Sequence, residues 1–197
     1  MAPAIVEHGY VIVEGFMDRR LARILYAMLL LRQWRGESKR DKQMPNSLSH
    51  WGDSTLDATL IGFLPDLEAV VGCPLLPTYA YARLYLHGDC LPRHRDRAAC
   101  EIAATIHLGH TGAEPPPIRF APDIAVAQKP GDAVVYRGDH IEHWRDRFTG
   151  TNFGQMFLNY VRADGTRRHY LHDGRRDAFP PSLSKSHTLK QWPEDVQ

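Results

Sequence analysis

Cysteine is scarce in this sequence, and the few cysteines present are widely spaced. Only Cys73, Cys90 and Cys100 occur in 197 residues, an odd number with no CxxC or zinc-knuckle spacing. This pattern argues against a disulfide-stapled scaffold and against a cysteine-based zinc or redox motif, since these need pairs or clusters of cysteines. A reduced environment is the simplest setting for such a chain, so the sequence predicts a cytoplasmic protein.

Long hydrophobic runs are missing as well. The most apolar stretch, residues 24–31, is eight residues long, whereas a helix that crosses a bilayer needs about 20 residues. Arg32 and Trp34 follow this stretch with no small-residue cleavage site, so it does not resemble a secretory signal. We therefore expect residues 24–31 to form a buried helix, and no membrane partner is predicted.

An excess of charge of either sign is also absent. The 24 Lys and Arg residues balance 23 Asp and Glu residues, which leaves a net charge of +1. No global field draws such a chain to nucleic acid, so a nucleic-acid partner is not expected. Apolar residues make up 43% and charged residues 24%, which is ordinary for a globular protein. Residues 1–180 are expected to form a single domain, and residues 181–197 a loose tail.

The hydrophobic pattern divides the chain into a helical first part and a strand-rich second part. A short strand is expected at residues 10–13 and a helix at residues 19–33, which Asp18 is placed to cap. Residues 54–71 are typical of a helix that is interrupted at Gly62 and Pro65. The later strands, separated by Gly and Pro turns, predict an antiparallel sandwich or barrel. They are expected at residues 77–86, 100–108, 118–120, 124–127, 133–136 and 154–161.

The most informative stretch contains two possible metal ligands, His94 and Asp96. Residues two apart in an extended chain point to the same face, so this imidazole and this carboxylate can bind adjacent positions on one metal ion. A third ligand is expected from a distant strand, and both His140 and His143 lie about 45 residues later. Two histidines and one carboxylate on one face of a metal ion leave three positions open, as in non-haem Fe(II) oxygenases.

A His-x-Asp pair on its own is weak evidence. Between Arg93, Arg95 and Arg97, the same two residues are more commonly part of an exposed, salt-bridged surface. The triplet also resembles the catalytic loop of protein kinases, but this chain is too short and lacks their phosphate loop and Asp-Phe-Gly motif. The order of the surrounding elements is what favours a metal site. A tyrosine precedes the pair, and an apolar strand, a Pro-Gly-Asp turn, another strand and a histidine follow it.

Together these pieces resemble the core of Fe(II)- and 2-oxoglutarate-dependent dioxygenases of the prolyl-hydroxylase-like kind. The resemblance covers a core of about residues 74–163, and residues 9–16 resemble the entry strand and helix of that group. It implies a mainly β fold with supporting N-terminal helices, built as a double-stranded β-helix (jelly-roll) barrel. The matching pieces are Tyr85, residues 94–96, 101–108, 130–136, 142–145 and 155–161.

The resemblance also implies the ligands and the reaction. His94, Asp96 and His143 would bind Fe(II), because His143 precedes Trp144 and Arg145 where the distal ligand of the family lies. His140 is the alternative, or a turn residue that orients a ligand. 2-Oxoglutarate and O₂ would be the co-substrates. The expected reaction is hydroxylation of a small molecule or of an amino-acid or peptide substrate.

One part of the family pattern is missing. The family carries a Lys or Arg on the strand after the distal histidine, which pairs with the far carboxylate of 2-oxoglutarate, but residues 153–155 of this chain are Phe, Gly and Gln. Arg83 is the first candidate replacement, because a guanidinium can bind a carboxylate through two hydrogen bonds. Arg145, two residues after His143, is the second. Tyr85 as a hydroxyl donor and Gln155 as a neutral contact complete the expected co-substrate residues.

Substrate contacts are expected from residues 36–53, a charged stretch that predicts a loop. His50 and Trp51 lie within it, and binding residues often gather on loops over a rigid scaffold. A loop with few apolar contacts should be mobile and could close over the metal, although a loop packed on the barrel is the alternative. Tyr81, on the strand face shared with Arg83 and Tyr85, is a third candidate substrate contact.

Two other classes of function stay open at this point. The missing basic residue after His143 is compatible with a hydrolase or isomerase that uses Zn²⁺ or Mn²⁺ in the same barrel. A non-catalytic binding module would explain residues 93–97 as surface salt bridges. Metal analysis separates the binding module from the enzymes, and succinate formation separates the oxygenase from the hydrolase.

Overall fold

The computed structural model describes residues 1–41, 43–175 and 178–180; the predicted tail at 181–197 lies outside them. Four helices and eleven strands are found in these residues. The helices are α1 (Pro3–His8), α2 (Arg19–Trp34), α3 (Ser54–Gly62) and α4 (Leu64–Val71), and two 3₁₀ segments span Ala98–Cys100 and Arg168–Gly174. The strands are β1 (Tyr10–Val13), β2 (Lys39–Arg40), β3 (Leu48–Trp51), β4 (Leu75–Leu86), β5 (Leu91–His94), β6 (Ile102–Thr111), β7 (Ile118–Phe120), β8 (Ile124–Val126), β9 (Ala133–Tyr136), β10 (His143–Arg145) and β11 (Asn152–Arg162).

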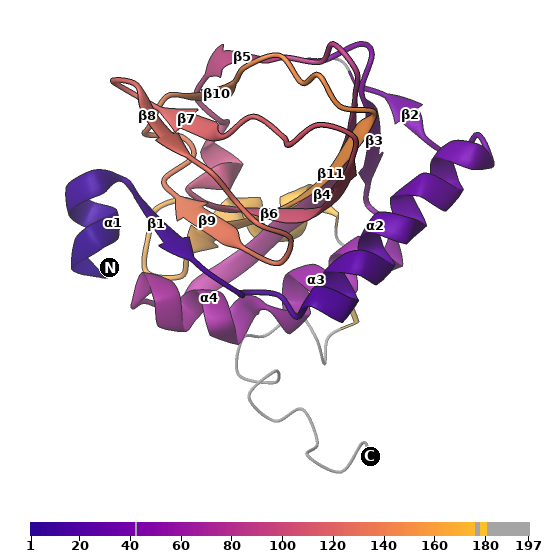
Figure 1. Cartoon of the computed structure of the whole chain (residues 1–197). Coiled ribbons are helices and arrows are strands. Elements are labelled where there is room, and N and C mark those ends of the chain that lie inside the picture. Colours follow the sequence, from indigo (N-terminus) through magenta and orange to yellow (C-terminus); the bar gives the residue numbers. More distant parts are fainter. Residues whose placement is uncertain (42, 176–177, 181–197) are drawn as a thin grey trace.

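Two antiparallel sheets face each other and enclose a barrel (Figure 1). The larger sheet has the strand order β1-β9-β6-β11-β4-β3-β2, and the smaller has the order β5-β10-β7-β8. Strands distant in sequence are neighbours in both sheets, as when β11 pairs with both β4 and β6. This arrangement is the double-stranded β-helix, so the fold predicted from the sequence is confirmed.

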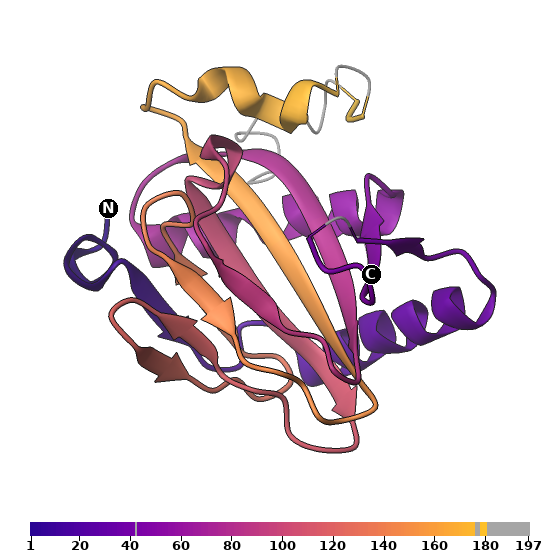
Figure 2. The same ribbon diagram turned by 90° about the horizontal axis from the view of Figure 1, so that it is seen from above.

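The helices α2, α3 and α4 cover the outer face of the larger sheet, and α1 lies beside the edge strand β1 (Figures 1 and 2). The α2 helix begins at Asp18, whose carboxylate accepts the backbone N–H groups of Arg20 and Leu21 that would otherwise lack partners. The expected interruption at Gly62 divides the next helical stretch into α3 and α4. Among the described residues, no helix combines the length and the apolar character needed to cross a membrane.

Alternation along β4 and β11 gives the two faces of the larger sheet different chemistry. Successive side chains of a strand point to opposite faces, and here the outward side chains are apolar while the inward ones are aromatic or polar. The outward residues, packed in the helix-covered core, are Ala80, Ala82, Leu84, Met156, Leu158 and Tyr160. The inward residues, which face the barrel interior, include Tyr79, Tyr81, Arg83, Phe157 and Asn159. The barrel therefore has a polar interior that can bind a ligand.

The stretch at residues 36–53 differs from the expectation of a mobile loop. It contains β2 and β3, which extend the larger sheet, and β3 pairs with β4. The turn between them is tied to the barrel, because the buried Asp41 carboxylate lies 2.9 Å from the guanidinium of Arg83 and the Met44 side chain is buried. The stretch is held to the barrel by an ion pair between residues far apart in sequence, and its low apolar content gave no indication of that contact.

Close contact between α2 and the larger sheet depends on two adjacent glycines. Gly109 of β6 and Gly154 of β11 are paired across the strands, and the ring of Tyr26 lies against both. A Cβ atom would lie 2.7 Å from that ring at position 109 and 2.8 Å from it at position 154. The Tyr26 hydroxyl hydrogen-bonds with Thr111, 2.8 Å away, which holds the ring in place.

We therefore expect Gly154→Ala to destabilise the fold by about 1–3 kcal/mol, the usual cost of overpacking. Urea unfolding of the purified chain measures this change. Gly62→Ala is the matched control, because no atom lies within 4 Å of a Cβ at that helical position, and alanine favours a helix over glycine. Equal stabilities of Gly154→Ala and the unaltered chain would contradict the packing described here.

Candidate functional site

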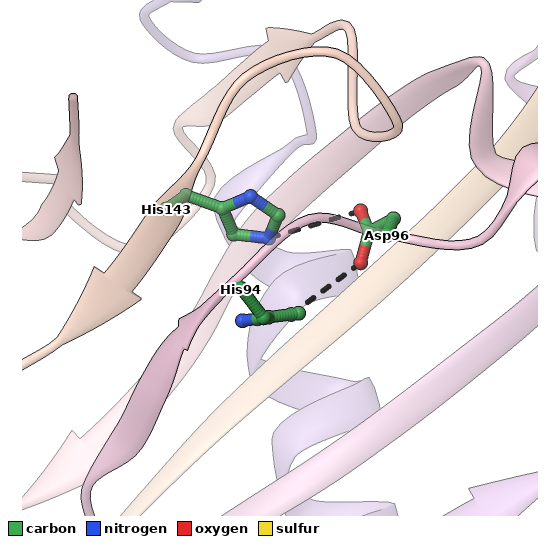
Figure 3. Close-up of side chains that lie close together, drawn as sticks. All are labelled: His94, Asp96 and His143. Carbon is green, nitrogen blue, oxygen red and sulfur yellow. Dashed lines mark ion pairs between the residues drawn. The ribbon is translucent and has the colours of Figure 1, made fainter.

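Pairing of β5 with β10 brings two histidines to one point inside the barrel. His94 and His143 are direct partners in the strand register, and their ring centres lie 4.4 Å apart. Asp96 follows two residues after His94, and its carboxylate lies 3.5 Å from His94 Nε2 and 3.7 Å from His143 Nε2 (Figure 3). One ligand atom from each residue fits within a 4.8 Å cluster. This cluster has the donor set and the compactness of a metal site.

Backbone carbonyls orient both imidazoles of the cluster. His94 Nδ1 lies 2.8 Å from the Pro92 carbonyl and His143 Nδ1 lies 3.1 Å from the Ile141 carbonyl. Because a carbonyl can only accept, each Nδ1 carries a proton, which leaves each Nε2, on the Asp96 side, as the nitrogen that can bind a metal ion. Burial lowers the pKa of His143, which favours the neutral form that a metal ligand needs. For His94, burial acts in the same direction, but the Asp96 carboxylate and the Pro92 carbonyl outweigh it and raise the pKa.

A glycine in the β9–β10 connection leaves room for the Asp96 carboxylate. The backbone N–H of Asp96 donates to the Gly138 carbonyl at 2.9 Å, which fixes the chain just after β5. A Cβ atom at position 138 would lie 2.4 Å from Asp96 Oδ2. His140, the alternative ligand, is exposed two residues further on and is not part of the cluster. The geometry therefore favours His143 as the third metal ligand.

The cluster lies in the wall of a cavity of about 940 Å³ that occupies the barrel interior. His94, Asp96 and His143 line it together with an aromatic surface supplied by the inward faces of β4 and β11. Other lining residues come from β2, from β3 and from the 3₁₀ segment at Arg168–Gly174. The aromatic residues that line the cavity are Trp51, Tyr79, Tyr81, Tyr136 and Phe157.

Arg145 places a buried positive charge at this cavity, two residues after His143 on the same face of β10. Its guanidinium donates to the Pro116 carbonyl and to Gln128 Oε1, both at 2.8 Å. Within the described residues, no carboxylate lies in ion-pair contact with it. Burial lowers its pKa, opposed chiefly by Tyr85. A buried guanidinium with neutral partners alone has the chemistry of a site for an anion.

Two further hydrogen-bond donors at the same end of the barrel lack acceptors. The Tyr85 hydroxyl and Gln155 Nε2 are buried and make none of the hydrogen bonds found in the described residues. Thr105 donates its hydroxyl to Gln155 Oε1 and accepts at its carbonyl from Gln128 Nε2, at 2.5 and 2.8 Å. Since Gln128 also binds Arg145, one chain of hydrogen bonds joins the amide to the guanidinium. Unpaired buried donors are costly, so a missing acceptor is indicated here.

Arg83, the first candidate from the sequence, has its charge already paired. Its guanidinium lies 2.9 Å from Asp41 and 3.0 Å from the amide oxygen of Gln43. Three aromatic rings lie within 5.8 Å of it, two of them Tyr81 and Tyr85. Arg83 therefore ties the β2–β3 turn to the barrel, whereas Arg145 has no carboxylate partner among the described residues.

The position of Phe153 explains why the expected basic residue on β11 can be absent. Phe153 pairs with Tyr85 of β4, so its side chain faces the same end of the barrel. The guanidinium carbon of Arg145 lies 5.3 Å from the centre of the Phe153 ring. The positive charge therefore reaches this region from β10 instead of β11.

Two of the three candidate substrate residues line the cavity, and the third does not. Tyr81 and Trp51 are cross-strand partners and both line the cavity. His50 is a partner of Ala82, whose side chain packs on the helical side of the sheet, and it hydrogen-bonds with Ser38 at 3.0 Å. His50 therefore faces away from the cavity. Sequence reasoning missed two charged residues of the cavity wall, Arg97 and Asp173, because neither lies in a periodic pattern.

Solved structures show the same fold, although no family model and no curated protein matches the chain. A prolyl-4-hydroxylase from Pseudomonas putida is 16% identical, with 81% of this chain and 95% of that chain covered at a TM-score of 0.66. The epimerase SnoN, in complex with Fe³⁺, alpha ketoglutarate and nogalamycin RO, is 16% identical, with 91% and 94% covered at 0.67. HygX from Streptomyces hygroscopicus, with nickel and 2-oxoglutarate bound, is 12% identical, with 83% and 88% covered at 0.64. The chain therefore has the double-stranded β-helix fold of the iron- and 2-oxoglutarate-dependent oxygenases.

Proposed function

We propose that this protein is an Fe(II)- and 2-oxoglutarate-dependent oxygenase that hydroxylates a small-molecule or amino-acid-type substrate. His94, Asp96 and His143 would hold the metal, and Arg145, Tyr85 and Gln155 would hold 2-oxoglutarate. When bound, the metal and 2-oxoglutarate supply the oxidising chemistry, in which O₂ and 2-oxoglutarate yield succinate, CO₂ and a substrate with one added oxygen atom. The substrate would enter from the side lined by Tyr81 and Trp51.

The observation that carries this proposal is a set of buried donors without a carboxylate partner, one of which, Arg145, lines the same cavity as the metal cluster. Arg145, the Tyr85 hydroxyl and Gln155 Nε2 are all buried donors that lack a carboxylate partner within the described residues. A carboxylate accepts several hydrogen bonds and neutralises a guanidinium, so one end of a dicarboxylic acid fits this set. The metal cluster and Arg145 lie on the same cavity, which suits a ligand that reaches both.

The residues of the chain would orient the ligands and exclude water. Asp96 and the two imidazoles lie close together (Figure 3) and line the cavity, so a metal ion that they hold could also bind ligands in the cavity. Arg145 is held in place by Pro116 and Gln128, so its hydrogen-bond donors are oriented before a ligand arrives. The β2–β3 turn, tied down by Arg83, covers this end of the barrel with the buried Met44 side chain.

A metal-dependent hydrolase or isomerase needs no 2-oxoglutarate, so that function does not explain the donors of Arg145, Tyr85 and Gln155. The missing basic residue on β11 was its main support, and Arg145 supplies a cation in that region. Hydroxylation remains the proposed outcome within the oxygenase class, although structural neighbours include an epimerase and a carbocyclase. Anaerobic titration with Fe(II) and 2-oxoglutarate tests the proposal, since chelation of the metal produces a visible charge-transfer band. Absence of the band would contradict it.

Metal binding should depend on His94, Asp96 and His143 and not on His140, the third histidine nearby. We expect His94→Ala, Asp96→Ala and His143→Ala each to weaken Fe(II) binding by about 100-fold or more, because each removes a ligand and even supporting residues contribute about 10- to 100-fold. His140→Ala is the matched control and should bind Fe(II) normally. Equilibrium dialysis under anaerobic conditions measures the affinities. Loss of binding in His140→Ala together with retention in His143→Ala would reassign the third ligand.

Affinity for 2-oxoglutarate should depend on Arg145. We expect Arg145→Gln to raise the dissociation constant by roughly 10- to 150-fold, the equivalent of about 1.5–3 kcal/mol for a hydrogen bond to a charged group. Lys39→Gln is the control, because it removes another cation that lines the same cavity, and it should change the constant less than about twofold. Titration of the charge-transfer band gives the constants. A large effect of Arg83→Gln without one in Arg145→Gln would move the anchor to β4.

A further inference from the structure

The substrate side of the cavity contains an ion pair that neither the metal cluster nor the 2-oxoglutarate residues use. Arg97 donates from both terminal nitrogens to the two carboxylate oxygens of Asp173, at 2.8 and 2.7 Å. Both side chains line the cavity. This two-point contact between a fork of donors and a planar carboxylate is the arrangement with which proteins recognise carboxylic acids.

Arg97 is held ready to bind a carboxylate in the cavity that the metal cluster also lines. It directly follows the metal ligand Asp96, and its guanidinium carbon lies 4.4 Å from the centre of the Tyr79 ring. The Tyr79 hydroxyl hydrogen-bonds with Cys100 Sγ at 3.1 Å, which fixes the ring beneath the guanidinium. The Arg97 side chain is nevertheless 49% exposed. The cation is thus pre-oriented and accessible, whereas Arg83 and Arg145 are buried.

Asp173 reaches Arg97 from a segment with an unusual backbone. His172 and Asp173 have φ angles of 54° and 53°, and Gly174 continues the left-handed conformation at 75°. Among the described residues, these two are the non-glycine residues with positive φ. Such a conformation persists when surrounding contacts hold it, and it often accompanies functional segments. A second two-point pair, between Arg175 and Asp57 of α3 at 2.8 Å, ties the segment to the body of the protein.

We propose that Arg97 recognises a carboxylate of the substrate and that Asp173 occupies this position until the substrate displaces it. This assignment rests on the proposed oxygenase function and names its substrate class as a carboxylic acid. Exchange of one carboxylate for another keeps the guanidinium paired, and the Arg97 side chain is 49% exposed and open to an incoming carboxylate, although the Asp173 side chain is only 15% exposed. The substrate carboxylate would bind Arg97, the residue that follows the metal ligand Asp96 in the sequence. Tyr79 and Tyr81, which line the same cavity, would lie beside the rest of the molecule.

A purely structural ion pair and a displaceable one respond differently to substitution. If the pair only fastens the C-terminal segment, removing either partner loosens the segment, and both variants shift ligand binding in the same direction. If Asp173 competes with the substrate, removing it strengthens the binding of a carboxylate, and removing Arg97 weakens that binding. Opposite signs for the two variants therefore identify competition.

The test uses two probes that differ in charge. Phenylacetate carries a carboxylate and an aromatic ring that suits Tyr79 and Tyr81, and phenylacetamide is its neutral counterpart. Each probe is titrated calorimetrically into the full chain, with and without saturating Ni²⁺ and 2-oxoglutarate. Asp173→Asn is the main variant because asparagine tolerates the left-handed conformation. Asp57→Asn is the matched control, since it loosens the same segment and leaves Arg97 paired.

We expect Asp173→Asn to bind phenylacetate about fivefold more tightly than the unaltered chain, which is the upper range for an exposed ion pair. Arg97→Gln should bind phenylacetate no better than phenylacetamide. The proposal is overturned if both variants shift in the same direction, if Asp57→Asn reproduces the gain, or if phenylacetate fails to bind Asp173→Asn. Failure of Ni²⁺ or 2-oxoglutarate to bind would instead overturn the proposed function, because the two probes also report on Arg97 without them.

Discussion

The register between β5 and β10 is the constraint on which the site depends. His94 and His143 belong to strands about 50 residues apart in sequence, and only their direct pairing brings both imidazoles to one point. Asp96 then needs no strand of its own, because the chain leaves β5 and is held by the Gly138 carbonyl. Both strands are short, so the pairing of β10 with β7, which joins His143 to Phe120, also supports the position of His143.

Three arginines, Arg83, Arg97 and Arg145, line the cavity in the barrel, and each has a different electrostatic role. Arg83 is neutralised by Asp41 and fastens the β2–β3 turn, which closes one end. Among the described residues, Arg145 donates hydrogen bonds only to neutral groups, so its positive charge is not neutralised. Arg97 is paired with Asp173, but its side chain is more exposed than those of the other two arginines. Burial and partner, rather than residue type, decide whether each arginine fastens the fold or serves a ligand.

Sequence reasoning succeeded where local spacing determines geometry and failed where distant partners do. The two-residue spacing of His94 and Asp96 and the alternation along β4 follow from strand periodicity, so both were predictable. Spacing could place Arg83 on the inner face, but it could not reveal that Asp41 neutralises it. The same limit hid Asp173, because its segment lacks a periodic pattern and gains its position from contacts with other elements.

The closeness of Arg145 and Phe153 has a consequence for how this barrel can evolve. A lysine at position 153 would place a second buried cation within reach of the Arg145 guanidinium, now 5.3 Å from the Phe153 ring, and like charges in a dry site repel strongly. Loss of Arg145 alone would leave that end of the barrel with Arg83, whose charge is already paired with Asp41. A substitution at position 145 or 153 alone therefore gives an impaired protein, and we expect the two positions to change together. Among natural relatives, we expect an arginine at the first position to accompany an uncharged residue at the second, and a lysine or arginine at the second to accompany its loss at the first.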